Sequence, residues 1–223
     1  MVEAVLLLSA VFLAAILDPG TPDPNAPVPI GTALVGTIVP TALAALVAVV
    51  ITKLRGNGPV IDLRLAISWP DLKVGLKFGA GGVVLTVIGA YLWTRIVGAN
   101  DASSAIGSLL DGNRMEVAPA VAMFVYIWLI GPIFEEIIFR GLLWGAIERQ
   151  KWGRWAAFGL STAIFAASHL EPLRTTLLLV IAVPIGLARL FTGRLPASIV
   201  AHQLNNFLPA VATLLVALGL MSK

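Results

Sequence analysis

Long apolar runs dominate this chain and limit what it can fold into. A helix that crosses the roughly 30 Å hydrocarbon core of a membrane needs about 20 apolar residues. Seven runs reach or approach that length. They are residues 2–17, about 31–52, about 74–98, about 117–147, 155–170, 175–188 and 196–220. We therefore predict an all-α fold, a polytopic transmembrane helix bundle with about seven spans.

The composition supports a membrane protein. Only 12% of the residues are charged and 58% are hydrophobic, whereas soluble domains carry roughly 25% charged residues. The chain has no cysteine, which excludes disulfides and thiolate metal sites. We divide it into residues 1–115, with three spans and their loops, and residues 116–223, with four spans.

Lysine and arginine residues alternate in density between the runs, and this pattern predicts orientation. Four lie in one set of alternate linkers, at Arg95, Arg114, Arg174 and Lys223. Ten lie in the other set, at Lys53, Arg55, Arg64, Lys73, Lys77, Arg149, Lys151, Arg154, Arg189 and Arg194. The chain is therefore predicted to be an integral, multi-pass membrane protein with its N-terminus in the cytoplasm and its C-terminus outside. Abundant alanine, and arginine in excess of lysine, favour a bacterial cytoplasmic membrane.

The N-terminal half carries packing signals rather than chemistry. The first run has no positive residue before it, unlike a secretory signal, and is interpreted as a retained span. The mixed segment 53–73 is predicted to lie at the membrane interface. Gly79, Gly81 and Gly82 predict close contact between helices.

Ionisable side chains inside the apolar runs are costly in a membrane and usually mark function. They gather in the C-terminal half, together with one amide: Glu135, Glu136, Arg140, His169, His202 and Asn206. Glu136 and Arg140 are four residues apart, so they share a helix face and are predicted to pair. Glu135 is turned about 100° away and stays available for another role.

The numbering also predicts depth within the membrane. Glu135 and His169 each lie 17 residues from Trp152, at the centre of a predicted helical hairpin. Equal distances from the turn place the two side chains at similar height, where they can face each other. His202 lies nine residues past Gly193 and is expected to be nominally shallower.

This set of side chains permits amide hydrolysis. A carboxylate and an imidazole that converge can hold and deprotonate a water molecule, and burial makes a carboxylate a stronger base. A second imidazole and an amide can donate hydrogen bonds to a developing oxyanion. We therefore assign water activation to Glu135 and His169, and oxyanion binding to His202 and Asn206.

A metal is the competing explanation. Two histidines and a glutamate are the ligands of many catalytic zinc sites. The helical signature His-Glu-x-x-His is absent, and the two histidines lie 33 residues apart on different runs. We predict that no cofactor is needed, with zinc as the alternative that the sequence leaves open.

Three short motifs resemble those of one known family. GPIFEEIIFRGLLWG, at residues 131–145, resembles the Glu-Glu-x-x-x-Arg motif of the CPBP family of CAAX proteases and bacteriocin-processing enzymes. FAASH, at 165–169, is similar to the family's Phe-x-x-x-His motif, and HQLNN, at 202–206, to its His-x-x-x-Asn motif. The order agrees, and the resemblance extends over about residues 116–209.

The resemblance implies an intramembrane endopeptidase of the glutamate type, with a metal-assisted mechanism as the alternative. Glu135 is then the general base, His169 helps to position the water, and His202 and Asn206 bind the oxyanion. Supporting roles fall to Glu136, Arg140 and Phe165. The expected partners are the lipid bilayer and a membrane-bound or lipid-modified protein or peptide substrate, with no nucleic acid.

Two other classes of protein remain open from the sequence. One is a non-catalytic membrane immunity or scaffold protein that keeps the motifs for structural reasons. The other is a transporter that uses the same polar residues as an ion path. Transporters often show paired repeats and broken helices in both halves, whereas the polar residues here lie in one half only.

Overall fold

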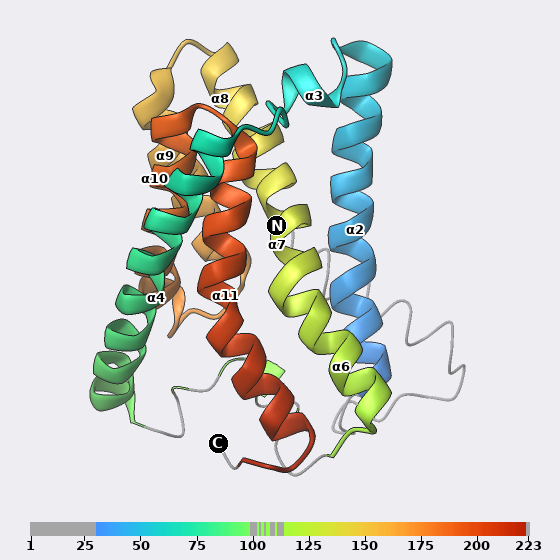
Figure 1. Ribbon diagram of the computed structural model, residues 1–223, viewed down its shortest axis with the longest axis vertical. Helices are drawn as coiled ribbons and strands as arrows, with labels where there is room; N and C mark the ends of the chain where they lie inside the picture. The colour runs from blue at the N-terminus through green and yellow to red at the C-terminus, as the bar shows by residue number, and fades with distance from the viewer. Residues whose placement is uncertain are drawn as a thin grey trace.

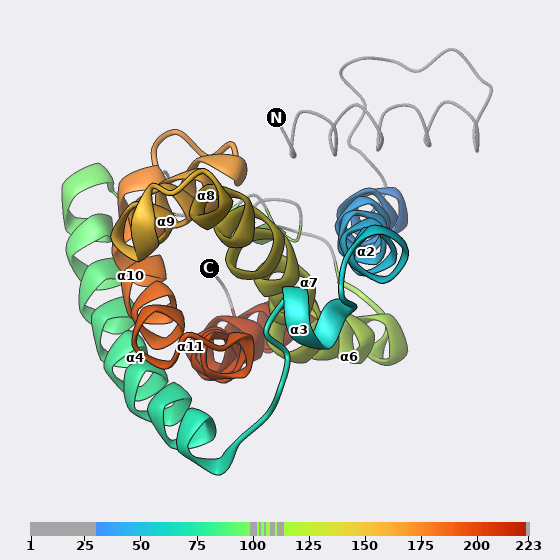
Figure 2. The ribbon, with the colours of Figure 1, turned by 90° about the horizontal axis from the view of Figure 1, so that it is seen from above.

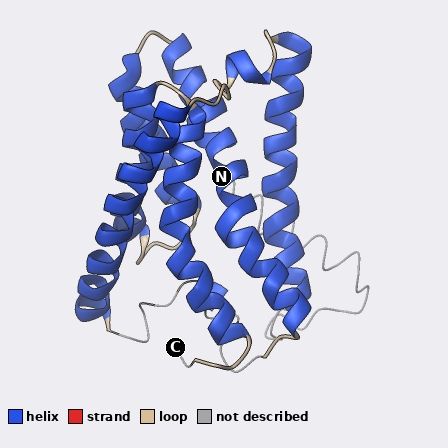
Figure 3. Cartoon of the chain, viewed as in Figure 1, coloured by secondary structure: helices blue, strands red, loops and turns tan. Residues whose placement is uncertain are grey.

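The computed structural model describes residues 30–98, 102, 104, 106–107, 110 and 114–221. These residues form helices and no strand (Figure 3). The first helices are α2 (Ile30–Arg55), α3 (Pro59–Asp62) and α4 (Trp69–Val97). A long rod follows, made of α6 (Val117–Val125), η1 (Tyr126–Ile130), α7 (Gly131–Glu136), η2 (Ile137–Leu143) and α8 (Trp144–Arg149). The last three helices are α9 (Gly153–Ser168), α10 (Thr175–Thr192) and α11 (Leu195–Ala217).

The prediction of an all-α transmembrane bundle is confirmed. Five stretches are long and apolar enough to cross a membrane: Leu34–Arg55, Trp69–Val97, Val117–Arg149, Thr175–Thr192 and Leu195–Ala217. The run predicted at 155–170 is α9, which has 16 residues. The run predicted at 2–17 lies outside the described residues. The orientation of the termini stays a prediction.

The helices of the C-terminal half follow one another around a ring when the molecule is seen from above (Figure 2). The rod from α6 to α8 passes between two neighbours, because α7 contacts α2 on one side and α11 on the other (Figure 1). The rod and α11 run in opposite directions. On the outside of the ring, α4 packs along both α10 and α11. This arrangement places α7 between α2 and α11, while α4 makes most of the contacts between the two halves of the chain.

Local sequence explains the tight turn between α10 and α11. Gly193 ends α10 with a φ of +66°, a left-handed conformation that glycine adopts without steric cost. Pro196 lies in the first turn of α11, where its missing N–H has no partner to lose. The short connection brings the two helices together antiparallel, and α4 then packs over both.

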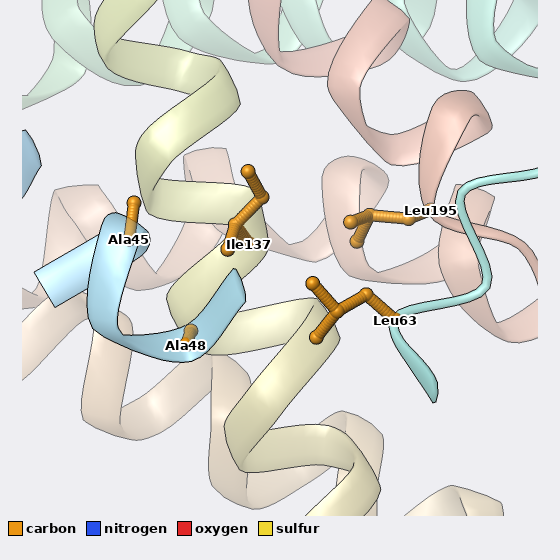
Figure 4. Packing of buried hydrophobic residues seen from close by; sticks show 5 residues of the cluster. All are labelled: Ala45, Ala48, Leu63, Ile137 and Leu195. Carbon is orange, nitrogen blue, oxygen red and sulfur yellow. The ribbon is translucent and has the colours of Figure 1, made fainter. Parts of the chain in front are cut away.

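The segment between α3 and α4 ties α2 to the ring. Leu63 is 1% exposed and packs with residues from three helices, namely Ala45 and Ala48 of α2, Ile137 of η2 and Leu195 of α11 (Figure 4). The next residue in the chain, an arginine, accepts a backbone hydrogen bond from Leu195 N at 3.0 Å. The segment predicted to lie at the interface is thus anchored by one buried leucine.

Glycines of α4 allow the close approach of α11. A Cβ on Gly79 would lie 3.1 Å from Ala201 Cα, and one on Gly82 would lie 3.1 Å from Asn205 Oδ1. Gly81 has no atom within 4 Å of its Cβ position. The predicted contact role is therefore confirmed for Gly79 and Gly82 and is wrong for Gly81, which faces away from the neighbouring helix.

The largest effect at this interface is expected at Gly75. A Cβ there would lie 2.6 Å from the backbone oxygen of Ala197, and a backbone oxygen cannot rotate away. Gly75→Ala should lower the free energy of unfolding by about 1–3 kcal/mol, the usual cost of overpacking. Gly81→Ala is the matched control on the same helix and should leave stability unchanged or slightly raised. Unfolding of both variants in detergent micelles measures the difference, and equal stability would contradict the packing described.

Candidate active site

Two wide helical turns bracket the adjacent glutamates. Glu135 and Glu136 end the six-residue helix α7, which lies between the π-helical turns η1 and η2. In a π-turn the backbone bonds reach five residues back instead of four, and such turns are frequent at functional sites. Pro132 sits in the first turn of α7 and has no N–H to donate. The backbone is therefore irregular on both sides of the two carboxylates.

Glu136 is fully buried and holds two partners. Its Oε1 accepts a hydrogen bond from Arg140 Nη1 at 2.9 Å, and both side chains are 0% exposed. The same oxygen lies 3.0 Å from Nδ1 of His202 on α11. Because a carboxylate can only accept, Nδ1 of His202 carries the proton in this contact. The predicted pairing of Glu136 with Arg140 is confirmed, and His202 joins it.

Glu135 points to the other ring nitrogen of the same histidine. Its Oε2 lies 3.5 Å from His202 Nε2, and its side chain is 28% exposed, in contrast to the buried Glu136. The imidazole of His202 thus stands between the two neighbouring carboxylates. His202 therefore reaches the level of Glu135, although the numbering placed it nominally shallower.

Phe165 links the two histidines through ring contacts. Its ring centroid lies 4.8 Å from that of His169 and 5.6 Å from that of His202, both edge-on. The guanidinium of Arg140 lies over the same ring at 4.4 Å. His169 Nδ1 lies 2.9 Å from the backbone oxygen of Phe165, and since a carbonyl only accepts, Nδ1 donates. This bond fixes the orientation of the His169 ring beside Phe165.

The two adjacent asparagines of α11 have different partners. Asn206 Nδ2 donates to the backbone oxygen of Ile127 in η1 at 3.2 Å. Asn205 is buried on another face, where its Oδ1 accepts from Thr86 Oγ1 of α4 at 2.7 Å. Asn206 is therefore the asparagine directed toward the rod that carries the glutamates. Its second amide hydrogen is not used by the Ile127 contact.

Histidine and glutamate, both present in the candidate site, are residue types that bind zinc. Among the residues that the structure describes, no three His, Asp or Glu side chains lie close enough together to hold a metal ion. His202 uses Nδ1 on Glu136, and His169 uses Nδ1 on a backbone oxygen. Bonds of this kind orient an imidazole whether or not it binds a metal, so the need for a cofactor stays a prediction.

Sequence reasoning missed Arg189. The apolar runs predict a linker at this position, but α10 extends to Thr192 and Arg189 is 2% exposed within the helix. Its Nε donates to the backbone oxygen of Arg140 in η2 at 3.0 Å, and its guanidinium lies over Trp144 at 5.1 Å. A charged residue at the edge of an apolar run was the available signal. Arg189 thus gives the backbone oxygen of Arg140 a hydrogen-bond donor and helps to hold in place the turn that carries the buried ion pair.

The three motifs thus converge in space from four helical elements. The first supplies Glu135, Glu136 and Arg140 from α7 and η2, and the others supply their residues from α9 and α11. A family model described as type II CAAX prenyl endopeptidase Rce1-like matches residues 117–208. Over these residues the chain is similar to the Rce1-like CAAX prenyl endopeptidases. No curated protein and no solved structure matches the chain.

The Rce1-like match agrees with the resemblance inferred from the motifs, both in family and in extent. It covers the rod, α9, α10 and the first part of α11, and these elements carry every side chain of the candidate site. Together with the apolar helices, the match supports an intramembrane protease of the CAAX type in general outline.

Proposed function

We propose that the chain is an intramembrane endopeptidase that hydrolyses a peptide bond with a water molecule activated at Glu135. The observation that carries this proposal is the difference between the two neighbouring carboxylates. Glu136 is buried and occupied by Arg140 and His202, whereas Glu135 is 28% exposed. Only Glu135 combines access from outside with a contact inside the polar cluster.

Charge balance explains why four ionisable groups can share one apolar bundle. Buried charges are tolerated when they are paired. Glu135 and Glu136 contribute two negative charges, and Arg140 contributes one positive charge. Arg140 offsets one of them, and the imidazole of His202 places one ring nitrogen against each carboxylate.

The proposed reaction begins with water held by Glu135, with the imidazole of His169 helping to position it. The carboxylate of Glu135 takes a proton from the water as the oxygen attacks the carbonyl carbon of the peptide. The carbon–nitrogen bond then breaks, and Glu135 gives the same proton to the departing amine. No covalent enzyme intermediate is formed, and the chain returns to its starting protonation.

His202 and Asn206 are proposed to stabilise the tetrahedral intermediate. Hydrogen-bond donors that are already oriented when charge develops are the most effective electrostatic catalysts. The imidazole of His202 is fixed by Glu136, and the amide of Asn206 is fixed by the backbone oxygen of Ile127. Asn206 has a second amide hydrogen for the substrate oxygen, and His202 would offer Nε2, the ring nitrogen that faces Glu135. The ring of Phe165 packs edge-on against both imidazoles and is proposed to keep water from that side of them.

The proposed substrate is a membrane-bound or lipid-modified peptide. Both glutamates, His202 and Asn206 lie on helices that are long and apolar enough to span a bilayer, so a substrate must reach them within or beside the membrane. The family description names prenyl endopeptidases, which makes a prenylated C-terminal peptide the first candidate. A non-catalytic immunity or scaffold role is the competing proposal, and it predicts no turnover.

Incubation of the purified protein with a panel of membrane peptides tests the proposal. The panel pairs each prenylated cysteine peptide with its unmodified form, and mass spectrometry identifies the products. We expect one defined internal cleavage by the wild type and none by Glu135→Ala, prepared in the same detergent. Equal cleavage by both proteins would remove Glu135 from the reaction, and no cleavage of any peptide by the wild type would favour the scaffold role.

A further inference from the structure

Gln203 makes a contact that none of the three motifs accounts for. It follows His202 on α11, and its Nε2 donates to the backbone oxygen of Leu129 in η1 at 3.0 Å. Its side chain is half-buried between α11 and the rod. The position falls among the variable residues of the His-x-x-x-Asn pattern, so the family resemblance gives it no role.

The irregular backbone of the rod explains why side-chain donors are useful there. In a π-turn the backbone oxygen of Ile127 would accept a hydrogen bond from the N–H of the residue five positions later. That residue is Pro132, which has no N–H. Asn206 supplies a donor to Ile127 in its place, and Gln203 supplies one to Leu129 in the same turn.

Three side chains of α11 therefore hold the rod at successive heights. Asn206 and Gln203 contact η1, which precedes the glutamates in the chain, and His202 contacts Glu136 itself. As the residue number rises along α11 it falls along the rod, as antiparallel helices require. A shift of one helix past the other would change all three contacts together.

We propose that Gln203 is a positioning residue that fixes the register of α11 against α7 and so sets the distance between Glu135 and His202. This inference rests on the proposed function of those two residues. The contact between Glu135 Oε2 and His202 Nε2 is 3.5 Å long. Gln203 follows His202 directly on α11, so its bond to Leu129 limits how far His202 can move relative to Glu135. Misplacement of reacting groups by about 1 Å can cost about 100-fold in rate.

Two variants separate hydrogen bonding from bulk. Gln203→Glu keeps the shape, but an ionised carboxylate cannot donate to the oxygen of Leu129, whereas a protonated carboxyl can. Gln203→Met keeps the length and cannot donate at any pH. We expect both to lower kcat by about 10- to 100-fold at neutral pH with KM little changed. The ratio of Gln203→Glu to wild-type kcat should rise as the pH falls, whereas the ratio for Gln203→Met should stay constant.

A second measurement does not depend on activity. Because the chain has no cysteine, spin labels can be placed at Val121→Cys of α6 and Leu208→Cys of α11, both at exposed positions. The distance distribution between the labels should shift or broaden when Gln203→Met is added, compared with the same labelled chain that keeps Gln203. An unaltered distribution together with wild-type kcat in both Gln203 variants would overturn the inference. Absence of turnover by the wild type would count against the proposed function alone, since the label distances still test the register.

Discussion

Glu135→Gln is expected to abolish most of the proteolytic activity while leaving the bundle intact. A glutamine at this position keeps the size of the side chain but cannot take a proton from water. A positioned general base contributes about 10²- to 10⁴-fold to a rate, so kcat/KM should fall by about that factor. Glu135 is partly exposed, and its Oε2 lies 3.5 Å from His202 Nε2. The free energy of unfolding should therefore change by less than about 1 kcal/mol. Product formation and unfolding are measured on the same preparation.

The neighbouring residue provides the matched control. Glu136→Gln removes the charge that Arg140 and His202 share, so it should lower both activity and stability. Of the two substitutions, Glu135→Gln should therefore lower activity alone, and Glu136→Gln should lower both activity and stability. Loss of stability in Glu135→Gln comparable to that in Glu136→Gln would contradict the division of roles.

Arg140→Met is expected to produce the largest loss of stability. The substitution leaves Glu136 as an uncompensated charge at a fully buried position. Breaking a buried ion pair by removing one partner costs about 3–5 kcal/mol. Arg140 also packs over the ring of Phe165 at 4.4 Å, and this contact is lost as well. Unfolding in mixed detergent micelles measures the effect.

The double variant Glu136→Gln, Arg140→Met tests the cause of that loss. It removes both charges together, so it should regain part of the stability that Arg140→Met loses. Activity should stay low, because His202 then has a neutral amide in place of the carboxylate that orients it. A double variant less stable than Arg140→Met would show that the loss came from packing and not from the unpaired charge.

Much of the fold could be predicted from the sequence because apolar length is nearly sufficient for a membrane bundle. The predicted run at 175–188 corresponds to α10 and the run at 196–220 to α11, with ends that differ by a few residues. The pairing of Glu136 with Arg140 followed from their spacing alone. It survives in the π-turn because residues four apart remain near neighbours on the wider helix.

The connections inside the site could not be predicted from spacing. His202 contacts both glutamates from another helix, and only the packing of α11 against α7 decides which imidazole faces Glu135. The π-turns were also missed, although Pro132 after a glycine was a signal of irregular backbone. Arg189 was missed because its helix extends one turn beyond the apolar run, which buries a charge that composition assigned to a loop.

A double-mutant cycle on kcat/KM for Glu135→Gln and His202→Gln tests the central claim most directly. If the two side chains act as one unit on the same water and carbonyl, the double variant should be no slower than the slower single variant. Each single variant should lose about 10²-fold or more. A double variant whose loss equals the product of the two single losses would show that Glu135 and His202 act independently, which contradicts the site described here.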